Sequence, residues 1–403
     1  MAVKNGYKQT EVGEIPEDWD VVPVSQKGKV VTGKALAVNA PGRQRPYLRT
    51  KNVFDGRIVT DDVLTMPMTD EQFTQFQVRS GDVLLNEGQS LELVGRCSIY
   101  QGEYPEPCAI QNALLRFRSF ADASAKYASY LFRYCQQTGV FAKIALQTTS
   151  IAHLGGSRLE RLPLAWPPTK AEQEAIAEAL SDADALIESL EQLIAKKRQI
   201  KQGAMQQLLT GQKRLPGFSG DWGKAVLEEV ADCLDNLRVP LNDAERQKRK
   251  GSIPYCGANG VLDYINDYVV DDDVILMAED GGYFDEYMYR PIAYRMTGKC
   301  WVNNHAHILK AKQDTDQGFL FYSLVHKNLM PFIASGTRAK LNRSELNKIE
   351  VTIPGSKAEQ TAIAETLSDM DEEIAALEAK LSKARQLKQG MMPELLTGKT
   401  RLL

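Results

Sequence analysis

The sequence Lys170-Ala171-Glu172-Gln173-Glu174-Ala175-Ile176-Ala177-Glu178 returns later in the chain as Lys357-Ala358-Glu359-Gln360-Thr361-Ala362-Ile363-Ala364-Glu365. The match continues without gaps, because residues 170–215 align with 357–402 and 28 of 46 positions are identical. Both copies end on Leu-Leu-Thr-Gly, followed shortly by Arg-Leu. Internal repeats organise folds, so the rest of the chain is interpreted around this one.

Each copy is predicted to be one long helix. Thr169 with Glu172, and Ser356 with Glu359, have the spacing of a capping box, and Gly211 and Gly398 are typical helix ends. Apolar residues recur every 3.5 positions on average, which is typical of a coiled-coil seam: Ile176, Leu180, Ala183, Ile187, Leu190, Ile194 and Ile363, Leu367, Met370, Ile374, Leu377, Leu381. Acidic residues dominate the first half of the first copy and basic residues its second half. We therefore predict an antiparallel coiled coil within one chain, with pairing between two chains as the alternative.

Between the helices lie two unlike blocks of mixed helix and strand pattern. The predicted fold is α+β, with two globular domains separated by two long helices in a pseudo-two-fold repeat. The predicted boundaries are 1–168 for the first domain, 169–215 for the central helix, 216–355 for the second domain and 356–403 for the last helix. Strands are expected at 82–86, 113–118, 274–278 and 306–310, and helices at 126–137 and 319–328. A short apolar strand is expected before each long helix, at 161–167 and 348–354.

Composition excludes several classes of protein. The chain has 403 residues, a formal charge of −3 and six cysteines, none of them in a C-x-x-C pair. That pattern argues against zinc knuckles and disulfide frameworks and favours a reduced, cytoplasmic protein. No run of about 18 apolar residues is present, so no membrane span is expected. The charge argues against coating nucleic acid by bulk attraction and leaves local basic surfaces open.

Catalytic motifs are nearly absent. Gly398-Lys399-Thr400 resembles the end of a phosphate-binding loop, but it lacks the upstream glycine and follows a helix. His305 and His307 are candidates for a metal pair, although a DNA-contacting or structural role is favoured. Asp271-Asp272-Asp273 is interpreted as a solvated turn, with a metal-dependent nuclease site including Glu279 and Asp280 as the alternative. We predict no catalytic residue and no metal site.

Side chains suited to DNA recur in both blocks. Lys and Arg neutralise phosphates, Arg reads guanine, and Asn and Gln read adenine in the major groove. Any single basic cluster is more often a solvated face, so the recurrence carries the prediction. The candidate DNA-binding residues are Arg43, Arg45, Arg49, Lys51, Asn86, Gln89, Gln147, Asn259, Asn303, Asn304, His305, Arg338, Lys340, Asn342 and Arg343.

With these motifs, the chain resembles the specificity subunit of type I restriction–modification enzymes over essentially its whole length. The doubled Lys-Ala-Glu-Gln-x-x-Ile-Ala-Glu and Leu-Leu-Thr-Gly motifs carry the resemblance most strongly. Further motifs are Gly81-Asp82-Val83-Leu84-Leu85-Asn86-Glu87-Gly88, Tyr255-Cys256-Gly257-Ala258-Asn259-Gly260, Thr149-Ser150-Ile151-Ala152-His153-Leu154 and Lys340-Leu341-Asn342.

The resemblance implies a subunit without catalysis of its own. Each recognition domain would read one half of a bipartite, asymmetric site in double-stranded DNA. The helices would set the spacing and dock two adenine methyltransferase subunits, with motor-nuclease subunits as further partners. The chain itself would bind no cofactor: S-adenosylmethionine would belong to the methyltransferase, and ATP and Mg to the nuclease partner if present.

Two rival functions remain at this stage. A coiled-coil scaffold with two protein-binding domains would keep the helices without needing basic loops. A standalone nuclease or methyltransferase would show metal-dependent or S-adenosylmethionine-dependent turnover by itself.

Overall fold

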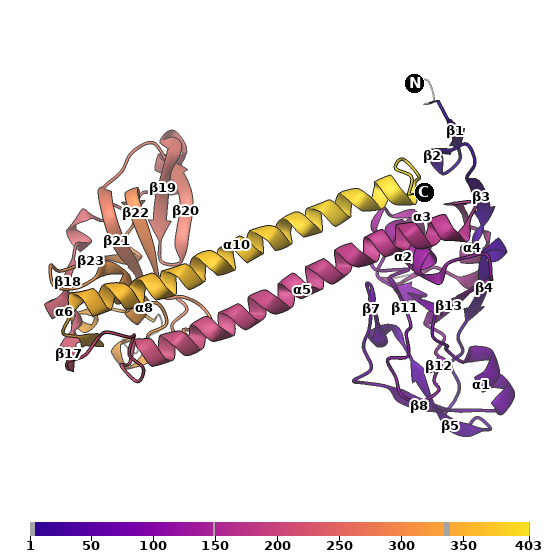
Figure 1. Cartoon of the computed structure of the whole chain (residues 1–403), viewed down its shortest axis with the longest axis horizontal. Coiled ribbons are helices and arrows are strands. Elements are labelled where there is room, and N and C mark those ends of the chain that lie inside the picture. Colours follow the sequence, from indigo (N-terminus) through magenta and orange to yellow (C-terminus); the bar gives the residue numbers. More distant parts are fainter. Residues whose placement is uncertain (1–4, 148–149, 334–338, 403) are drawn as a thin grey trace. The chain divides into compact units, whose positions relative to one another are not determined.

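The computed structural model describes residues 5–147, 150–333 and 339–402. The chain forms two compact units (Figure 1): unit 1 comprises Met1–Leu190 and Lys380–Leu403, and unit 2 comprises Glu191–Ala379. The long helices α5 (Lys170–Leu208) and α10 (Lys357–Leu396) each contribute a segment to both units. Among the described residues no helix is long and apolar enough to cross a bilayer.

Unit 1 is built around a four-stranded sheet and two three-stranded sheets. The larger sheet has the order β11 (Cys97–Ile99), β9 (Val83–Asn86), β13 (Leu114–Ser119), β4 (Gly28–Thr32). The smaller sheets are β12 (Ala109–Ile110), β5 (Arg43–Leu48), β8 (Leu64–Met68) and β10 (Gly88–Gln89), β15 (Ala152–His153), β14 (Leu146–Gln147). The other elements are β1 (Tyr7–Thr10), β2 (Gly13–Pro16), β3 (Asp20–Pro23), β6 (Val53–Phe54), β7 (Arg57–Ile58), β16 (Pro163–Trp166), α1 (Asp70–Phe76), α2 (Ala125–Gln137), α3 (Val140–Ile144) and α4 (Gly156–Arg161).

Unit 2 has one six-stranded sheet of order β18 (Ala231–Cys233), β23 (Ala306–Ala311), β21 (Val270–Ala278), β22 (Ala293–Val302), β19 (Lys250–Gly257), β20 (Gly260–Ile265). A separate pair joins β17 (Trp222–Val226) to β24 (Glu350–Pro354). The helices are α6 (Leu227–Val230), α7 (Asp243–Lys248), α8 (Gln317–Val325) and α9 (Arg343–Leu346). The expected α+β class, the strands and the helices of both blocks are confirmed. Asp271–Asp273, however, lie inside β21 and not in a turn.

The two long helices begin in the same way in both units. Gln173 is buried on α5, where its Oε1 accepts from the Ser124 amide at 2.8 Å. Gln360 on α10 does the same with the Asp316 amide, also at 2.8 Å. Each glutamine therefore fixes a long helix to the residues that start the short helix beside it, α2 in unit 1 and α8 in unit 2.

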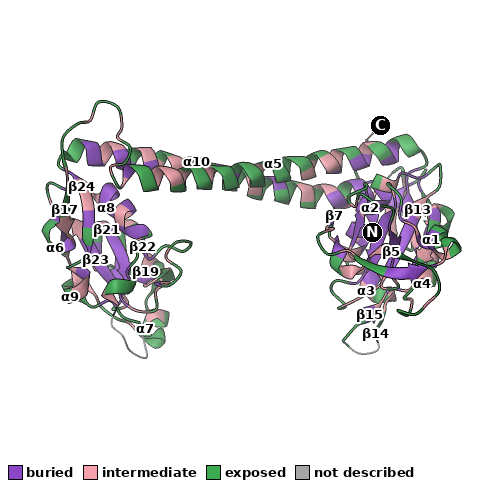
Figure 2. Ribbon diagram, turned by 90° about the horizontal axis from the view of Figure 1, so that it is seen from below, coloured by how far each residue is buried: buried purple, intermediate pink, exposed green. Residues whose placement is uncertain are grey.

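The segments of α5 and α10 run side by side in opposite directions within each unit (Figures 1 and 2). Ile176 and Leu180 of α5, and Ile363 and Leu367 of α10, are fully buried where the helices pack on the domains. The middle of both helices is largely exposed (Figure 2). The Lys201–Asp371 pair and the Lys388–Asp184 pair join basic ends to acidic starts. The predicted antiparallel pairing within one chain is confirmed.

The helix starts differ from the predicted capping boxes. The Glu172 amide donates to Thr169 Oγ1 at 3.2 Å, as predicted. The Glu172 carboxylate, however, accepts from Arg401 beyond the end of α10, with Arg401 Nη2 at 2.9 Å from Oε2. In unit 2 the Glu359 carboxylate likewise accepts from Arg214, with Nε at 2.6 Å from Oε1. An arginine is a stronger partner for a carboxylate than a backbone amide, because the hydrogen bonds are charge-assisted and bidentate.

Candidate nucleic-acid interface

The same backbone arrangement closes one end of the main sheet in both units. In unit 1 the Glu87 amide donates to the Ala113 carbonyl at 2.9 Å, and the Leu154 amide donates to the Glu87 carbonyl at 2.8 Å. In unit 2 the Glu279 amide donates to the His305 carbonyl at 2.9 Å, and the Leu341 amide donates to the Glu279 carbonyl at 2.8 Å. We call these places the strand-end sites, because Glu87 follows β9 and Glu279 follows β21.

The strand-end site of unit 1 is a small sheet carrying two of the predicted glutamines. Gln89 on β10 and Gln147 on β14 are both opposite Ala152 of the middle strand, β15. Beside them, Nδ1 of His153 is 3.0 Å from Oε2 of Glu87. Gln147 is exposed and Gln89 is partly exposed. The structure thus brings these two predicted residues together on one surface.

The strand-end site of unit 2 gathers more of the predicted residues. Asn259 Nδ2 donates to the Gly281 carbonyl at 2.8 Å, His305 Nδ1 is 2.6 Å from Asp280 Oδ1, and Lys340 Nζ is 2.9 Å from Glu279 Oε1. Asn304 is exposed next to His305. These side chains come from four separate segments, and the loop after β21 brings them together.

Two of the predicted residues are placed differently from the expectation of an exposed contact. Asn86 is completely buried and its Nδ2 donates to the Val53 carbonyl at 3.2 Å. Asn303 is buried as well, and its Oδ1 accepts from the His305 amide at 2.8 Å. Both side chains support the backbone beneath a strand-end site and do not face solvent. Arg338 lies outside the described residues.

The remaining predicted residues form two groups. One group lies on and after β5 in another sheet of unit 1, and the other follows Leu341 of the unit 2 strand-end site in sequence. Arg43 and Arg45 are on β5 and Arg49 and Lys51 follow it, packed on a second core of unit 1. Arg45 pairs with Asp70 at 2.9 Å and Arg49 pairs with Asp62, while Arg43 and Lys51 are exposed. Asn342 and Arg343 are exposed at the start of α9, directly after Leu341.

Acidic residues at the strand-end sites were not among the predicted contacts. Burial alone would raise the pKa of Glu279, but hydrogen bonds from Lys340 and Arg238 hold it below its ordinary value. Glu279 is therefore a carboxylate that orders two cations. The common pattern of a strand followed by Glu and glycine, at 83–88 and 274–282, was the signal in the sequence, but it does not name the partner residues.

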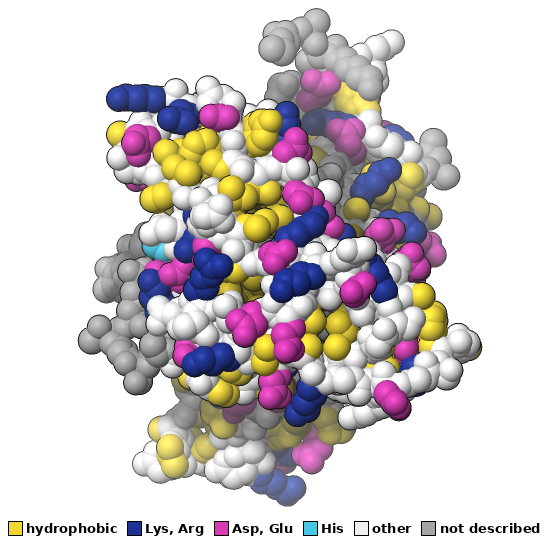
Figure 3. Space-filling view, turned by 90° about the vertical axis from the view of Figure 1, so that its left-hand side faces the viewer, with side chains coloured by type: hydrophobic (Ala, Val, Ile, Leu, Met, Phe, Trp, Pro, Cys, Tyr) yellow, Lys and Arg dark blue, Asp and Glu magenta, His cyan; other side chains and the backbone are white. Residues whose placement is uncertain are grey.

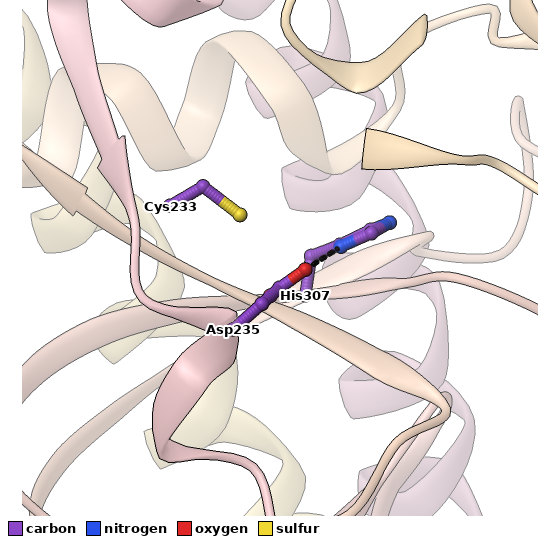
Figure 4. A group of neighbouring side chains, drawn as sticks. All are labelled: Cys233, Asp235 and His307. Atoms are coloured by element: carbon purple, nitrogen blue, oxygen red, sulfur yellow. Dashed lines mark hydrogen bonds and ion pairs between the residues drawn. The ribbon is translucent and has the colours of Figure 1, made fainter. Parts of the chain in front are cut away.

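A cluster of potential metal ligands lies below the unit 2 site. Cys233, Asp235 and His307 converge (Figure 4), with ligand atoms within 4.8 Å of one another. His307 Nδ1 is 2.7 Å from Asp235 Oδ2, and Nε2 is 2.8 Å from the Leu341 carbonyl. Arg238 also lies 3.1 Å from Asp235, and burial raises the pKa of the Cys233 thiol to about 12. A zinc ion needs a thiolate and an imidazole lone pair, so these residues fit an ion-pair cluster better than a metal site.

The two alternatives for metal chemistry that the sequence left open do not match this geometry. His305 is paired with Asp280, whereas His307 is paired with Asp235, so the histidines do not converge. Asp272 and Asp273 pair with Lys310 and Arg295 on neighbouring strands. Glu279 follows the opposite end of β21 from these aspartates, which separates it from them by about 20 Å at 3.3 Å per residue.

The surface charge is mixed. On the face of unit 2 drawn in Figure 3, basic and acidic side chains alternate and neither sign forms a continuous field. Local groups, and not a broad basic surface, therefore offer the specific contacts on this face.

The two units share the backbone arrangement of the strand-end site but carry different polar side chains on it. Such a molecule is a two-site recognition protein. The chain belongs to the type I restriction modification DNA specificity domain family, whose family model matches residues 16–200 and again 219–386. It therefore carries two DNA specificity domains, and the resemblance to specificity subunits is confirmed.

Relatives and solved structures agree with this assignment. The chain is 25% identical over 426 residues to a putative type I restriction enzyme MjaX specificity subunit of Methanocaldococcus jannaschii, covering 99% of this chain and 97% of that protein. It is 36% identical over 143 residues to the putative type I specificity subunit S.HindORF215P of Haemophilus influenzae, covering 36% of this chain and 35% of that protein. The fold is similar to an S subunit from M. genitalium, with a TM-score of 0.61, 16% identity and 98% of both chains covered.

Proposed function

We propose that this chain is the DNA-reading subunit of a type I restriction–modification complex, in which each unit reads one half of a bipartite, asymmetric site. One observation carries the proposal: the same backbone hydrogen bonds build both strand-end sites, while the exposed side chains on them differ. Glutamines occupy the site in unit 1, and Asn259, Asn304, His305 and Lys340 occupy it in unit 2. A shared scaffold with different polar groups suits two different half-sites.

In this proposal the chain performs no chemistry. The paired helices set the spacing between the half-sites and dock two adenine methyltransferase subunits, and motor-nuclease subunits join the complex in the cytoplasm. The methyltransferase binds S-adenosylmethionine, and the nuclease subunit uses ATP and Mg. Supporting this division of labour, the two helix copies are identical at 28 of 46 aligned positions, which suits two like partners.

The test is co-expression with the methyltransferase subunit of the same operon, followed by genome-wide mapping of methylated adenines. We expect one gapped, asymmetric motif that disappears when this chain is omitted. Methylation that is absent, or unchanged without this chain despite a stable complex, contradicts the proposal and favours a scaffold.

Paired variants then assign the half-sites. We expect Gln89→Ala with Gln147→Ala to relax one half of the motif, and Asn259→Ala with Asn304→Ala to relax the other. Gln313→Ala, at an exposed glutamine between β23 and α8, is the matched control and should leave the motif unchanged. Loss of both halves in either double variant would indicate damage to the complex and not to reading.

A further inference from the structure

The strand-end site of unit 1 continues into a cation that the sequence analysis did not single out. Asn86 is the last residue of β9 and directly precedes Glu87. Its amide donates to the Arg96 carbonyl at 2.9 Å, and its carbonyl accepts from the Gly95 amide, also at 2.9 Å. Arg96 therefore lies beside the strand-end site, where the segment that follows β10 returns to the sheet.

The guanidinium of Arg96 packs on an aromatic ring. Its Cζ is 4.7 Å from the ring centroid of Phe54, and Cζ of Arg57 is 5.5 Å from the same centroid. A cation over an aromatic ring is attracted by the negative charge of the ring face. Phe54 thus holds two guanidiniums near one ring, and we call Phe54, Arg57 and Arg96 the arginine–phenylalanine cluster.

Hydrogen bonds of buried groups fix the backbone beneath this cluster. Asn86 Nδ2 donates at 3.2 Å to the carbonyl of Val53, the residue before Phe54. The Gly56 amide donates to the Cys97 carbonyl at 3.0 Å, which ties the turn between β6 and β7 to β11. The cluster is therefore ordered before any ligand arrives, and an ordered site loses less entropy on binding.

Neither guanidinium has an acidic partner within the described part of the chain. Arg57 is exposed, whereas Arg96 is partly buried and its Nε is shielded from solvent without a hydrogen-bond partner. Burial lowers the pKa of Arg96, and the charge of Asp55 offsets only part of that effect. Asp55 itself is engaged by Arg133, with Nε at 2.8 Å from Oδ1. Because an unpaired and partly buried cation costs free energy, this arrangement indicates an anion supplied by a ligand.

Unit 2 has no cation at the equivalent position. The amide of Ala278, the residue before Glu279, donates to the Ile292 carbonyl at 3.1 Å. Ile292 therefore corresponds to Arg96, and it is 1% exposed in the core of unit 2. A ligand contact made by Arg96 should accordingly concern the half-site of unit 1 alone.

We infer that Arg96, together with Arg57, binds one backbone phosphate of the DNA beside the half-site that unit 1 reads. This inference rests on the proposed function. A phosphate compensates the charge of the guanidiniums and accepts charge-assisted, bidentate hydrogen bonds from them, whereas a neutral base edge leaves that charge uncompensated. Phosphate contacts fix the register of a protein on the duplex without reading sequence. The cluster therefore positions the DNA for Gln89 and Gln147, which face the bases.

The experiment changes both partners of the contact in the assembled methyltransferase bound to its mapped motif. The half-site relaxed by the paired Gln89 and Gln147 variants is the unit 1 half, and duplexes with one neutral methylphosphonate scan the phosphates around each half. In the wild type we expect one position beside the unit 1 half to lose affinity roughly tenfold. Arg96→Gln should bind the unmodified duplex roughly tenfold more weakly, and the same methylphosphonate should then cost nothing further.

Salt dependence and further variants separate a phosphate contact from other roles. The slope of log K against log salt should become shallower by about 0.9 in Arg96→Gln, which is the contribution of one phosphate, and Arg96→Lys should recover most of it because the charge is kept. Arg57→Gln should weaken binding at the same phosphate. Arg79→Gln, at an exposed arginine before the start of β9, is the matched control and should bind like the wild type. All four variants should keep the mapped motif.

Three outcomes would overturn the inference while the mapped motif stands. The first is an unchanged slope in folded Arg96→Gln, and the second is a relaxed base preference in that variant while the methylphosphonate still costs tenfold. If Arg96→Gln does not fold, the wild-type scan and Arg57→Gln decide, and the third outcome is the lack of any sensitive phosphate beside the unit 1 half. Failure to find any motif would instead reject the proposed function.

Discussion

Asn86 and Gln89 are three residues apart, yet the structure predicts opposite consequences for their loss. Asn86 is buried and bonds to Val53, so Asn86→Ala should lower the free energy of unfolding by about 1–3 kcal/mol. Gln89 is at the surface of β10, so Gln89→Ala should leave stability unchanged and cost about 1–3 kcal/mol of base discrimination. Denaturant unfolding and competition binding measure the two effects. A Gln89 variant that loses stability, but no discrimination, would contradict this division.

Asp184 makes stability depend on acid pH. Burial favours its neutral form, but hydrogen bonds and charges from Lys388 and Arg133 hold its pKa below the ordinary value of 3.8. A carboxyl with a lowered folded-state pKa stabilises the fold above its unfolded pKa and loses that contribution as pH falls through the folded one. We therefore expect the free energy of unfolding to decline below about pH 4. Asp184→Asn should reduce that decline, measured as the free energy of unfolding in urea titrations at several pH values. An unchanged pH dependence would exclude the ion pairs of Asp184 as a source of the acid sensitivity.

Sequence reasoning placed some site residues and missed others for a physical reason. Asn259, His305 and Lys340 were predicted separately from their side-chain chemistry, and the fold gathers them. Glu279 entered the sequence analysis only in the alternative of a metal-dependent nuclease site. Its importance comes from Lys340 and Arg238, which are distant in sequence, and no local pattern specifies such long-range partners. The burial of Asn86 cannot be predicted from the local sequence for the same reason.

At the scale of elements, the helix pair depends on its seam. Leu180 and Leu367 are equivalent in the repeat and fully buried, so either Leu→Ala change should cost about 2–5 kcal/mol. Leu186 on the same helix is 52% exposed, and Leu186→Ala is the control, expected to cost far less. Chemical unfolding followed by circular dichroism measures the difference. Equal losses at Leu180 and Leu186 would show that the seam does not dominate helix stability.

The arginine after each long helix closes the start of the other helix. Glu359 is 1% exposed and pairs with Arg214, so Arg214→Gln leaves a buried carboxylate without its cation. We expect a loss of about 3–5 kcal/mol in unfolding free energy. Adding Glu359→Gln should recover part of it, and Arg198→Gln, at an exposed pair with Glu378, should cost about 0–1 kcal/mol. No recovery in the double variant would contradict a specific ion pair.

The elements themselves were largely predictable, because the repeat, the 3.5-residue seam and the strand patterns are local. The error at Asp271–Asp273 has a clear cause. Three successive aspartates favour a turn in isolation, but Lys310 and Arg295 on adjacent strands pair with Asp272 and Asp273. These ion pairs therefore outweigh the low β propensity of aspartate at this end of β21. The Arg401–Glu172 pair likewise depends on antiparallel alignment and replaces the glutamate half of the predicted capping box, while the Thr169 half is present.

At the scale of the whole molecule, unit 1 is built from two separate stretches of sequence, whereas unit 2 is the single stretch Glu191–Ala379. Unit 1 closes with Met392, Leu395 and Leu396 from the end of α10, which are buried in the same core as Trp19 and Trp166. Unit 2 takes its part of α5 from before its own domain and its part of α10 from after it. The offset repeat makes this arrangement predictable, since each seam finds its partner in the other copy. Each unit therefore needs a segment of both long helices to be complete.

Net charge and internal pairing together predict how the chain binds DNA by itself. The formal charge is −3, and Arg45, Arg49 and Lys340 already have acidic partners within the chain. These three cations must leave their acidic partners before they can displace counterions, so we expect the isolated chain to bind the mapped duplex weakly. Its plot of log K against log salt should have a slope of about −1 to −3, since each neutralised phosphate contributes about −0.9.

With methyltransferase subunits present, the slope should steepen to about −6 or beyond, because the partners then supply most phosphate contacts. Filter binding between 50 and 200 mM salt, roughly the range over which such slopes separate, measures both states, with a duplex lacking the motif as the control. An isolated chain with the slope and affinity of the complex would show that its own basic residues leave their acidic partners and carry the phosphate contacts.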